Sequence, residues 1–175
     1  MKTKLGVFCF SILLLLGVAV PVLAQQRRLV EEGCRQGSCW ATYFLSKRLI
    51  HQNQLGGQNS KLYEVSLEVN SDYDGTKSRT QWVYCSLDKP FVAFDFPEED
   101  DEFVYFHYLS PANSLEIGGY NSGSYSLYWA ICHDRFIVDP FALTSTARQM
   151  GYNESITNYQ IVLPRVFFEE VMNSQ

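Results

Sequence analysis

The sequence has few histidines, the residue that most often binds transition metals and transfers protons near neutral pH. Its three histidines, His51, His107 and His133, lie far apart. None of them stands at the spacing from a cysteine or a second histidine that zinc sites require. The chain also has no low-complexity segment, internal repeat or long linker. We therefore expect no metal, no cofactor and a single globular domain.

The first 24 residues have the order of a cleavable secretory signal peptide. Two lysines precede an apolar run over residues 5–20, and Pro21 ends that run. A charged start, an apolar middle and a small residue at the end are typical of such leaders. The run approaches the roughly 18 apolar residues of a membrane-spanning helix, so an uncleaved anchor is the alternative. Because Pro21 and Ala24 suit processing better, we expect cleavage after Ala24 and a secreted or periplasmic domain over residues 25–175, which meets a membrane only during export.

The charge of the chain excludes one class of partner. Its 14 lysines and arginines stand against 19 aspartates and glutamates, and loss of the leader would change the net charge from −5 to −7. A surface of this sign repels nucleic acid. We therefore expect a protein or a glycan as the partner of this domain.

Four cysteines follow the leader, and their number agrees with export. An even number of cysteines in an oxidising compartment predicts two disulfides, although four cysteines allow three pairings. We favour the local pair Cys34–Cys39 together with Cys85–Cys132, whose members lie in strand-like segments. The longer loop should contribute about 4 kcal/mol in the chain-entropy model, against about 2 kcal/mol for the short one.

The first half of the domain predicts one helix followed by a hairpin. Residues 39–51 place apolar side chains along one helical face, which favours an amphipathic helix. Residues 62–69 instead alternate between apolar and polar side chains, which is typical of a half-buried strand. Asp74-Gly75 supplies a turn, and residues 80–85 alternate again, so a hairpin follows.

The second half predicts further strands and short helices. We expect the strands over residues 91–96, 103–109, 115–117, 125–132 and 159–163. Asp139 can cap a short helix with Pro140 at its first position and Gly151 just past its end. A helical turn or two is expected over residues 165–172. The predicted fold is α+β: a mainly antiparallel sheet of six or seven strands, flanked by an N-terminal helix and short C-terminal helices and stabilised by disulfides.

One short segment resembles the nucleophile segment of papain-like cysteine proteases. It reads Gly37-Ser38-Cys39-Trp40-Ala41, and a helix that begins there would lower the pKa of the thiol. The resemblance covers five residues. Papain-like enzymes also have a cysteine where this chain has Gln36, and a histidine roughly 130 to 150 residues after the nucleophile. The last histidine of the chain, His133, lies well short of that window, so we reject papain-like identity.

A looser resemblance is to transglutaminase-like domains, which also begin with a cysteine at a helix N-terminus and end the catalytic set with an Asp-Pro pair. Residues 136–140, with Asp139 before Pro140, are similar to that last element. The family's histidine should lie on the preceding strand, where this chain has Ser124 and Ser126. The resemblance implies a thiol acyl-transfer enzyme that uses Cys39, with His133 and Asp139 as its helpers.

The alternative is a non-catalytic binding or structural module, and we favour it. Aromatic residues make up 15% of the chain, and several of them cluster near the glycine-rich loop over residues 118–126. Aromatic side chains supply a large contact area at low entropic cost. The candidate binding residues are Tyr120, Tyr125, Tyr128 and Trp129. The competing interpretation is that Tyr125 and Trp129 belong to the core.

Overall fold

The computed structural model describes residues 27–55, 58–95, 102–118, 121–137 and 139–168. The expected leader and its cleavage point lie outside the described residues, as does Tyr120.

The domain is built on one antiparallel sheet whose strands follow one another in sequence order. Each strand pairs with its neighbours in the chain, so the sheet is a meander with β1 and β7 at its two edges. The strands are β1 (Arg28–Arg35), β2 (Ser38–Leu55), β3 (Gln58–Ser71), β4 (Gly75–Cys85), β5 (Phe91–Phe94), β6 (Phe103–Tyr108) and β7 (Tyr159–Pro164). The predicted α+β class and the mainly antiparallel sheet are confirmed.

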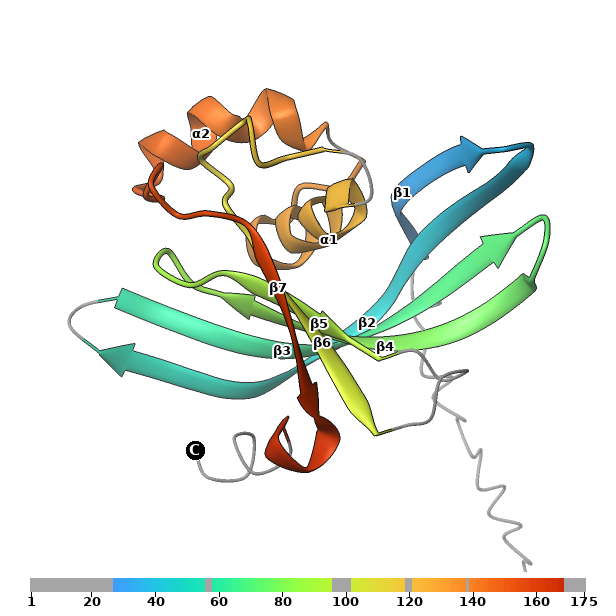
Figure 1. Ribbon diagram of the computed structural model, residues 1–175, viewed down its shortest axis with the longest axis horizontal. Coiled ribbons are helices and arrows are strands. Elements are labelled where there is room, and N and C mark those ends of the chain that lie inside the picture. Colours follow the sequence, from blue (N-terminus) through green and yellow to red (C-terminus); the bar gives the residue numbers. More distant parts are fainter. Residues whose placement is uncertain (1–26, 56–57, 96–101, 119–120, 138, 169–175) are drawn as a thin grey trace, which may run out of the picture.

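The helices lie between β6 and β7 in the chain and cover one face of this sheet. They are α1 (Ser122–His133), the 3-10 helix η2 (Pro140–Leu143) and α2 (Thr144–Gln149). Figure 1 shows α1 lying against the sheet and α2 above it. We name the face that meets α1 the inner face, and the opposite one the outer face. A short helical turn over residues 165–168 follows β7 on the outer side (Figure 1).

The predicted N-terminal helix is wrong, because residues 39–51 belong to the long strand β2. The pairing of β2 with β3 is irregular at two places, between Phe44 and Ser46 and between Leu49 and His51. Each β-bulge inserts an extra residue and shifts the alternation of side chains that follows it. The apolar residues of β2 therefore no longer recur with a period of two, and their spacing resembles that of a helix.

Two of the predicted strands are also wrong. Residues 125–132 lie in α1, and residues 115–117 form turns and an irregular segment. Seven consecutive residues of α1, from Tyr125 to Ile131, are buried. A helix that is buried on all sides has a continuous apolar sequence, which periodicity cannot distinguish from a buried strand.

The other predicted elements are confirmed over the described residues, although the strand expected over residues 91–96 ends at Phe94 and residue 96 lies outside the described residues. The turn at Asp74-Gly75 joins β3 to β4, and Gly75 has the positive φ of 71° that favours glycine. Asp139 caps η2, since its side chain accepts a hydrogen bond from the backbone N–H of Phe141. Gly151, at φ 91°, follows α2. The described part of the predicted C-terminal turn, residues 165–168, is helical.

Both disulfides form with the favoured pairing, Cys34–Cys39 and Cys85–Cys132. The first closes the turn between β1 and β2. The second joins the end of β4 to the last turn of α1, with the two Cα atoms 5.5 Å apart. It therefore ties the central helix to the sheet.

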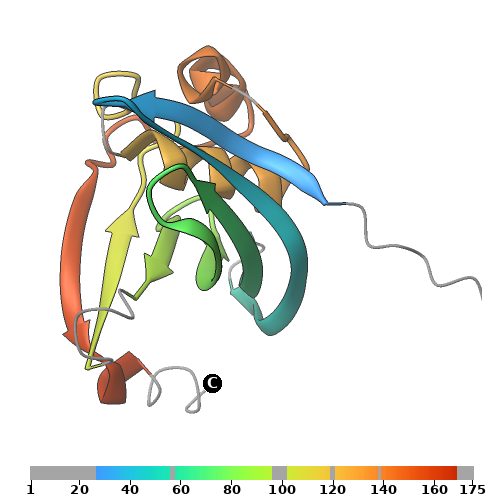
Figure 2. The same cartoon turned by 90° about the vertical axis from the view of Figure 1, so that its right-hand side faces the viewer.

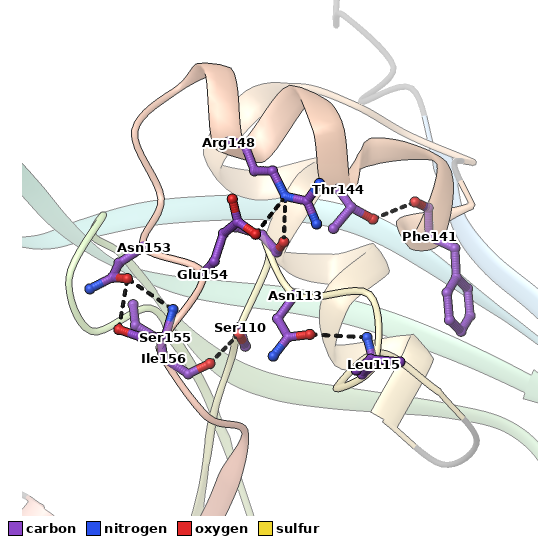
Figure 3. Close-up of polar contacts among 11 residues, drawn as sticks. Ser110, Asn113, Leu115, Phe141, Thr144, Arg148, Asn153, Glu154, Ser155 and Ile156 are labelled. Atoms are coloured by element: carbon purple, nitrogen blue, oxygen red, sulfur yellow. Dashed lines mark hydrogen bonds and ion pairs between the residues drawn. The ribbon is translucent and has the colours of Figure 1, made fainter.

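Polar contacts hold the connections on the helical side in place, as Figure 3 shows. Arg148 of α2 donates from Nε to the carbonyl oxygen of Ala112 at 3.1 Å and forms an ion pair with Glu154 at 3.2 Å. The hydroxyl of Ser110 donates to the carbonyl oxygen of Ile156. These contacts join the segment after β6, the helix α2 and the segment before β7 into one unit.

Candidate functional site

Three of the candidate binding residues lie in the core. Tyr125, Tyr128 and Trp129 are each 0% exposed. The reason is that their segment is a helix pressed against the inner face and not an exposed strand. This corrects the expectation of a binding face built from them and favours the competing interpretation, in which they are core residues.

The buried tyrosines form a hydrogen-bonded group with one histidine. The hydroxyl of Tyr128 lies 2.7 Å from that of Tyr152 and donates to the carbonyl oxygen of Ser86 at 3.1 Å. His133 Nε2 lies 2.8 Å from the Tyr152 hydroxyl. Burial raises the pKa of Tyr128 well above its ordinary value and that of Tyr152 to about 12. Both hydroxyls therefore stay protonated and connect α1 to the loops beside it.

The structure gives each candidate catalytic residue a structural role. Cys39 is oxidised in its disulfide with Cys34, so it has no thiolate to offer as a nucleophile. His133 at the end of α1 bonds to Tyr152, and Asp139 accepts from the backbone N–H of Phe141 at 3.0 Å. Among the described residues, no hydrogen bond or ion pair joins any two of Cys39, His133 and Asp139. The described ranges also hold no group of three or more potential metal ligands.

The outer face carries a row of four aromatic residues, one on each of the strands β4 to β7. Tyr84, Phe91, Tyr108 and Tyr159 are direct cross-strand partners. Successive ring centroids lie 5.1, 5.6 and 4.4 Å apart. The first three rings are half-buried, and Tyr159 at the end of the row is 48% exposed. We call this set the aromatic row.

The neighbouring part of the outer face is covered. Phe168, from the turn after β7, packs edge-on against Trp82 and Phe106, with ring centroids 4.7 and 5.6 Å away. These three residues belong to a second core cluster and are less than a tenth exposed. The C-terminal turn thus covers this part of the outer face, and the aromatic row lies at its border.

The row ends at the edge strand β7. In the described part of the chain, β7 pairs with β6 alone, and Figure 2 shows no strand or helix beyond it on its other side. The strand contains no charged residue, and its pairing with β6 has no irregularity. Val162 within β7 is 46% exposed, and Val166 and Phe167 just after it are 56% and 53% exposed.

The opposite edge is protected in the usual way. Edge strands of soluble proteins commonly carry charges or bulges, which prevent pairing with other chains. β1 has both: its sequence contains two arginines and two glutamates, and its pairing with β2 is irregular between Leu29 and Glu31. At β7, Pro164 at the end of the strand is the one such device. The two edges therefore differ in their capacity to accept another strand.

No residue of the aromatic row was a candidate binding residue in the sequence. Its members come from four separate strands, and the signal that could have found them is the register between those strands. Comparison of the chain with protein-family models, with curated proteins and with solved structures finds no match. Within the described residues, no helix has the length and apolar character needed to cross a membrane.

Proposed function

We propose that this protein is an exported, non-catalytic binding module that takes up an extended segment of a partner protein along β7. The observation that carries the proposal is an uncharged sheet edge, with no strand of the described residues paired to its outer side, at the exposed end of the aromatic row. Export is supported by the predicted leader and by the two disulfides, since such bonds persist in oxidising compartments.

Strand addition would use both the backbone and the side chains of β7. An added strand lies about 4.8 Å away and bonds to the free N–H and C=O groups of the edge. Its side chains would alternate between the two faces, next to Tyr159, Ile161 and Leu163 on the outer side and next to Val162 on the inner side. We therefore expect a partner segment of uncharged residues that is apolar on its outer-facing side.

The arrangement of the rings favours a protein over a glycan. A sugar ring stacks on the flat face of an aromatic ring, and that requires the face to be free. In the aromatic row, Tyr84 is stacked on Phe91 at 28°, and Tyr108 on Tyr159 at 14°. One flat face of each ring is thus in contact with a neighbouring ring, whereas the ring edges suit the side chains of an adjoining strand.

The test uses synthetic hexapeptides that alternate apolar and polar uncharged residues, together with the peptide that copies β7, and measures amide hydrogen exchange. We expect bound peptide to slow exchange in β7. Peptides N-methylated at alternate residues, which cannot donate those backbone hydrogen bonds, should have no effect.

Two matched lysine variants test whether the peptide binds along β7. Val162→Lys should weaken binding by about tenfold or more, because the added charge must be desolvated at the new interface. Val166→Lys makes the same change just beyond the strand and should leave binding unaltered. If no peptide protects β7, or if both lysine variants behave alike, the proposal is overturned. Protection by the β7 peptide alone would identify the partner as a second copy of this chain.

A further inference from the structure

A separate cavity lies on the inner face, between the sheet and the first turn of α1. Its volume is about 330 Å³, near the lower end of the roughly 300–1,000 Å³ of small-molecule sites. Its apolar walls are formed by Trp40, Leu67, Val69, Phe94 and Leu127. A cavity of this size with apolar walls suits a small ligand, provided that polar groups are present to orient it.

Polar groups of opposite charge line the two sides of this cavity. Arg79 and Gln81 belong to β4 and are two residues apart, so they lie on the same face. Glu31 belongs to β1, and its carboxyl oxygen accepts a hydrogen bond from the Thr42 hydroxyl at 3.4 Å. In the part of the chain that the structure describes, neither Arg79 nor Glu31 is in an ion pair. Asp95 also lines the cavity, and its carboxylate is paired with Arg165. Glu31 and Arg79 are thus two opposite charges that share one cavity without contacting each other.

The spacing of the strands keeps these charges apart. β2 and β3 lie between β1 and β4, so three strand spacings, or roughly 14 Å, separate the backbones that carry Glu31 and Arg79. Their side chains shorten this gap but do not close it. A half-buried charge with no opposite charge beside it costs free energy, which a ligand of complementary charge would recover. The complementary ligand carries a cation at one end and an anion at the other.

We propose that this cavity binds a small zwitterion with an apolar body and separated charges, of the kind that a dipeptide of apolar residues presents. The ammonium group lies against Glu31, and the carboxylate accepts hydrogen bonds from Arg79 and Gln81. The apolar side chains fill the space between Trp40, Leu67 and Leu127. A free α-amino acid fits less well, because its two charged groups are adjacent.

The experiment titrates the intact domain with the dipeptide Val-Phe, its N-acetyl form and its C-terminal amide, and with free phenylalanine. Calorimetry gives the affinity, and the fluorescence of Trp40 reports on the site. The other two tryptophans lie in the two core clusters. A fluorescence change that is lost in a Trp40→Phe variant therefore comes from Trp40. We expect Val-Phe to bind most tightly, and each blocked form to bind about tenfold or more weakly.

Two variants show which protein group meets which end of the ligand. In Glu31→Gln, N-acetylation should no longer matter, whereas amidation still weakens binding. In Arg79→Gln, the reverse should hold. Arg48→Gln removes a charge paired with Glu64 outside the cavity and should change nothing. Val162→Lys should also leave this affinity unaltered, which separates this site from the strand-addition site on β7.

Failure of the wild-type domain to bind Val-Phe with a dissociation constant below about 1 mM overturns the inference. So does an equal response of both variants to both blocked dipeptides. If either variant fails to fold, the ranking of the four ligands on the wild-type domain still decides the matter. Equal affinity for Val-Phe and its two blocked forms would exclude charge recognition at this cavity.

Discussion

The carboxyl group of Glu31 lies beside Gly123, so close that a Cβ atom on residue 123 would be 2.6 Å from Glu31 Oε2. The contact brings an edge strand, β1, to the first turn of α1. The positive end of the helix dipole and the hydrogen bond from Thr42 both favour the ionised carboxylate. Burial opposes them and is the larger effect, so the pKa of Glu31 is raised above its ordinary value of 4.5.

Gly123→Ala should destabilise the protein only while Glu31 is present. Alanine is the better helix former by up to about 1 kcal/mol, which by itself would stabilise α1. In the native protein, however, the new methyl group must displace the carboxyl group of Glu31. In a Glu31→Ala background that obstacle is gone, and the same change should be neutral or stabilising.

Urea denaturation of the four proteins of this double-mutant cycle gives the coupling. We expect an interaction energy of about 1 kcal/mol or more between the two positions. Gly118→Ala serves as a control, because its added Cβ would lie 3.7 Å from the nearest atom, an ordinary contact. A Gly123→Ala effect of equal size in both backgrounds would contradict the account.

Glu31→Gln should stabilise the protein at neutral pH and not at low pH. Since the pKa of Glu31 is higher in the folded than in the unfolded chain, the folded state binds the proton more tightly. The free energy of unfolding therefore falls as the pH rises from 4.5 through the raised pKa, and this contribution stays constant above it. Glutamine has a neutral amide, so burying its side chain carries no free-energy cost of desolvating a charge.

Denaturation midpoints measured between about pH 4 and pH 8 test this prediction. The advantage of Glu31→Gln over the native chain should be absent at the acid end and should grow to a plateau. Glu32→Gln changes the exposed neighbour on the same strand and is the control. A constant difference across the whole range would mean that Glu31 is not the group responsible.

Tyr152→Phe should destabilise the domain without changing its shape. The hydroxyl of Tyr152 is the shared partner of Tyr128 and His133. Without this hydroxyl, Tyr128 and His133 each lose a hydrogen-bond partner in the interior. The loss should lower the free energy of unfolding by about 1–3 kcal/mol. Tyr73→Phe removes a hydroxyl from a residue that is 88% exposed, and it should be neutral. Chemical denaturation of both variants makes the comparison, and similar stabilities would show that the buried group contributes nothing.

The regular strands and turns of the domain could be predicted because their local patterns agree with the tertiary structure. Residues 62–69 alternate with a period of two and lie in β3, which pairs with β4 without irregularity. The turn at Asp74-Gly75 needs the positive φ that glycine adopts at low cost. In both cases the local conformation follows from a few neighbouring residues.

The long strand and the central helix could not be predicted, because tertiary contacts decide them. The bulges of β2 appear only when its pairing with β3 is known, and the burial of α1 on all sides removes the helical pattern. The aromatic row was missed for a similar reason. Phe91 and Tyr108 are 17 residues apart in the chain and are brought together by the strand register. The cavity beside Glu31 combines residues from β1, β4 and α1 and has no sequence motif.

The two disulfides should differ in their contributions, and the structure gives the reason. The Cys85–Cys132 bond spans 47 residues and joins β4 to α1, whereas Cys34–Cys39 spans 5 residues and closes a turn that β1–β2 pairing already holds. Replacing the first pair by alanine should cost about 4 kcal/mol, and replacing the second about 2 kcal/mol or less. Thermal and urea unfolding of the two double variants measure these losses. If the short-range bond proves the more stabilising, the docking of α1 does not depend on its covalent link to β4.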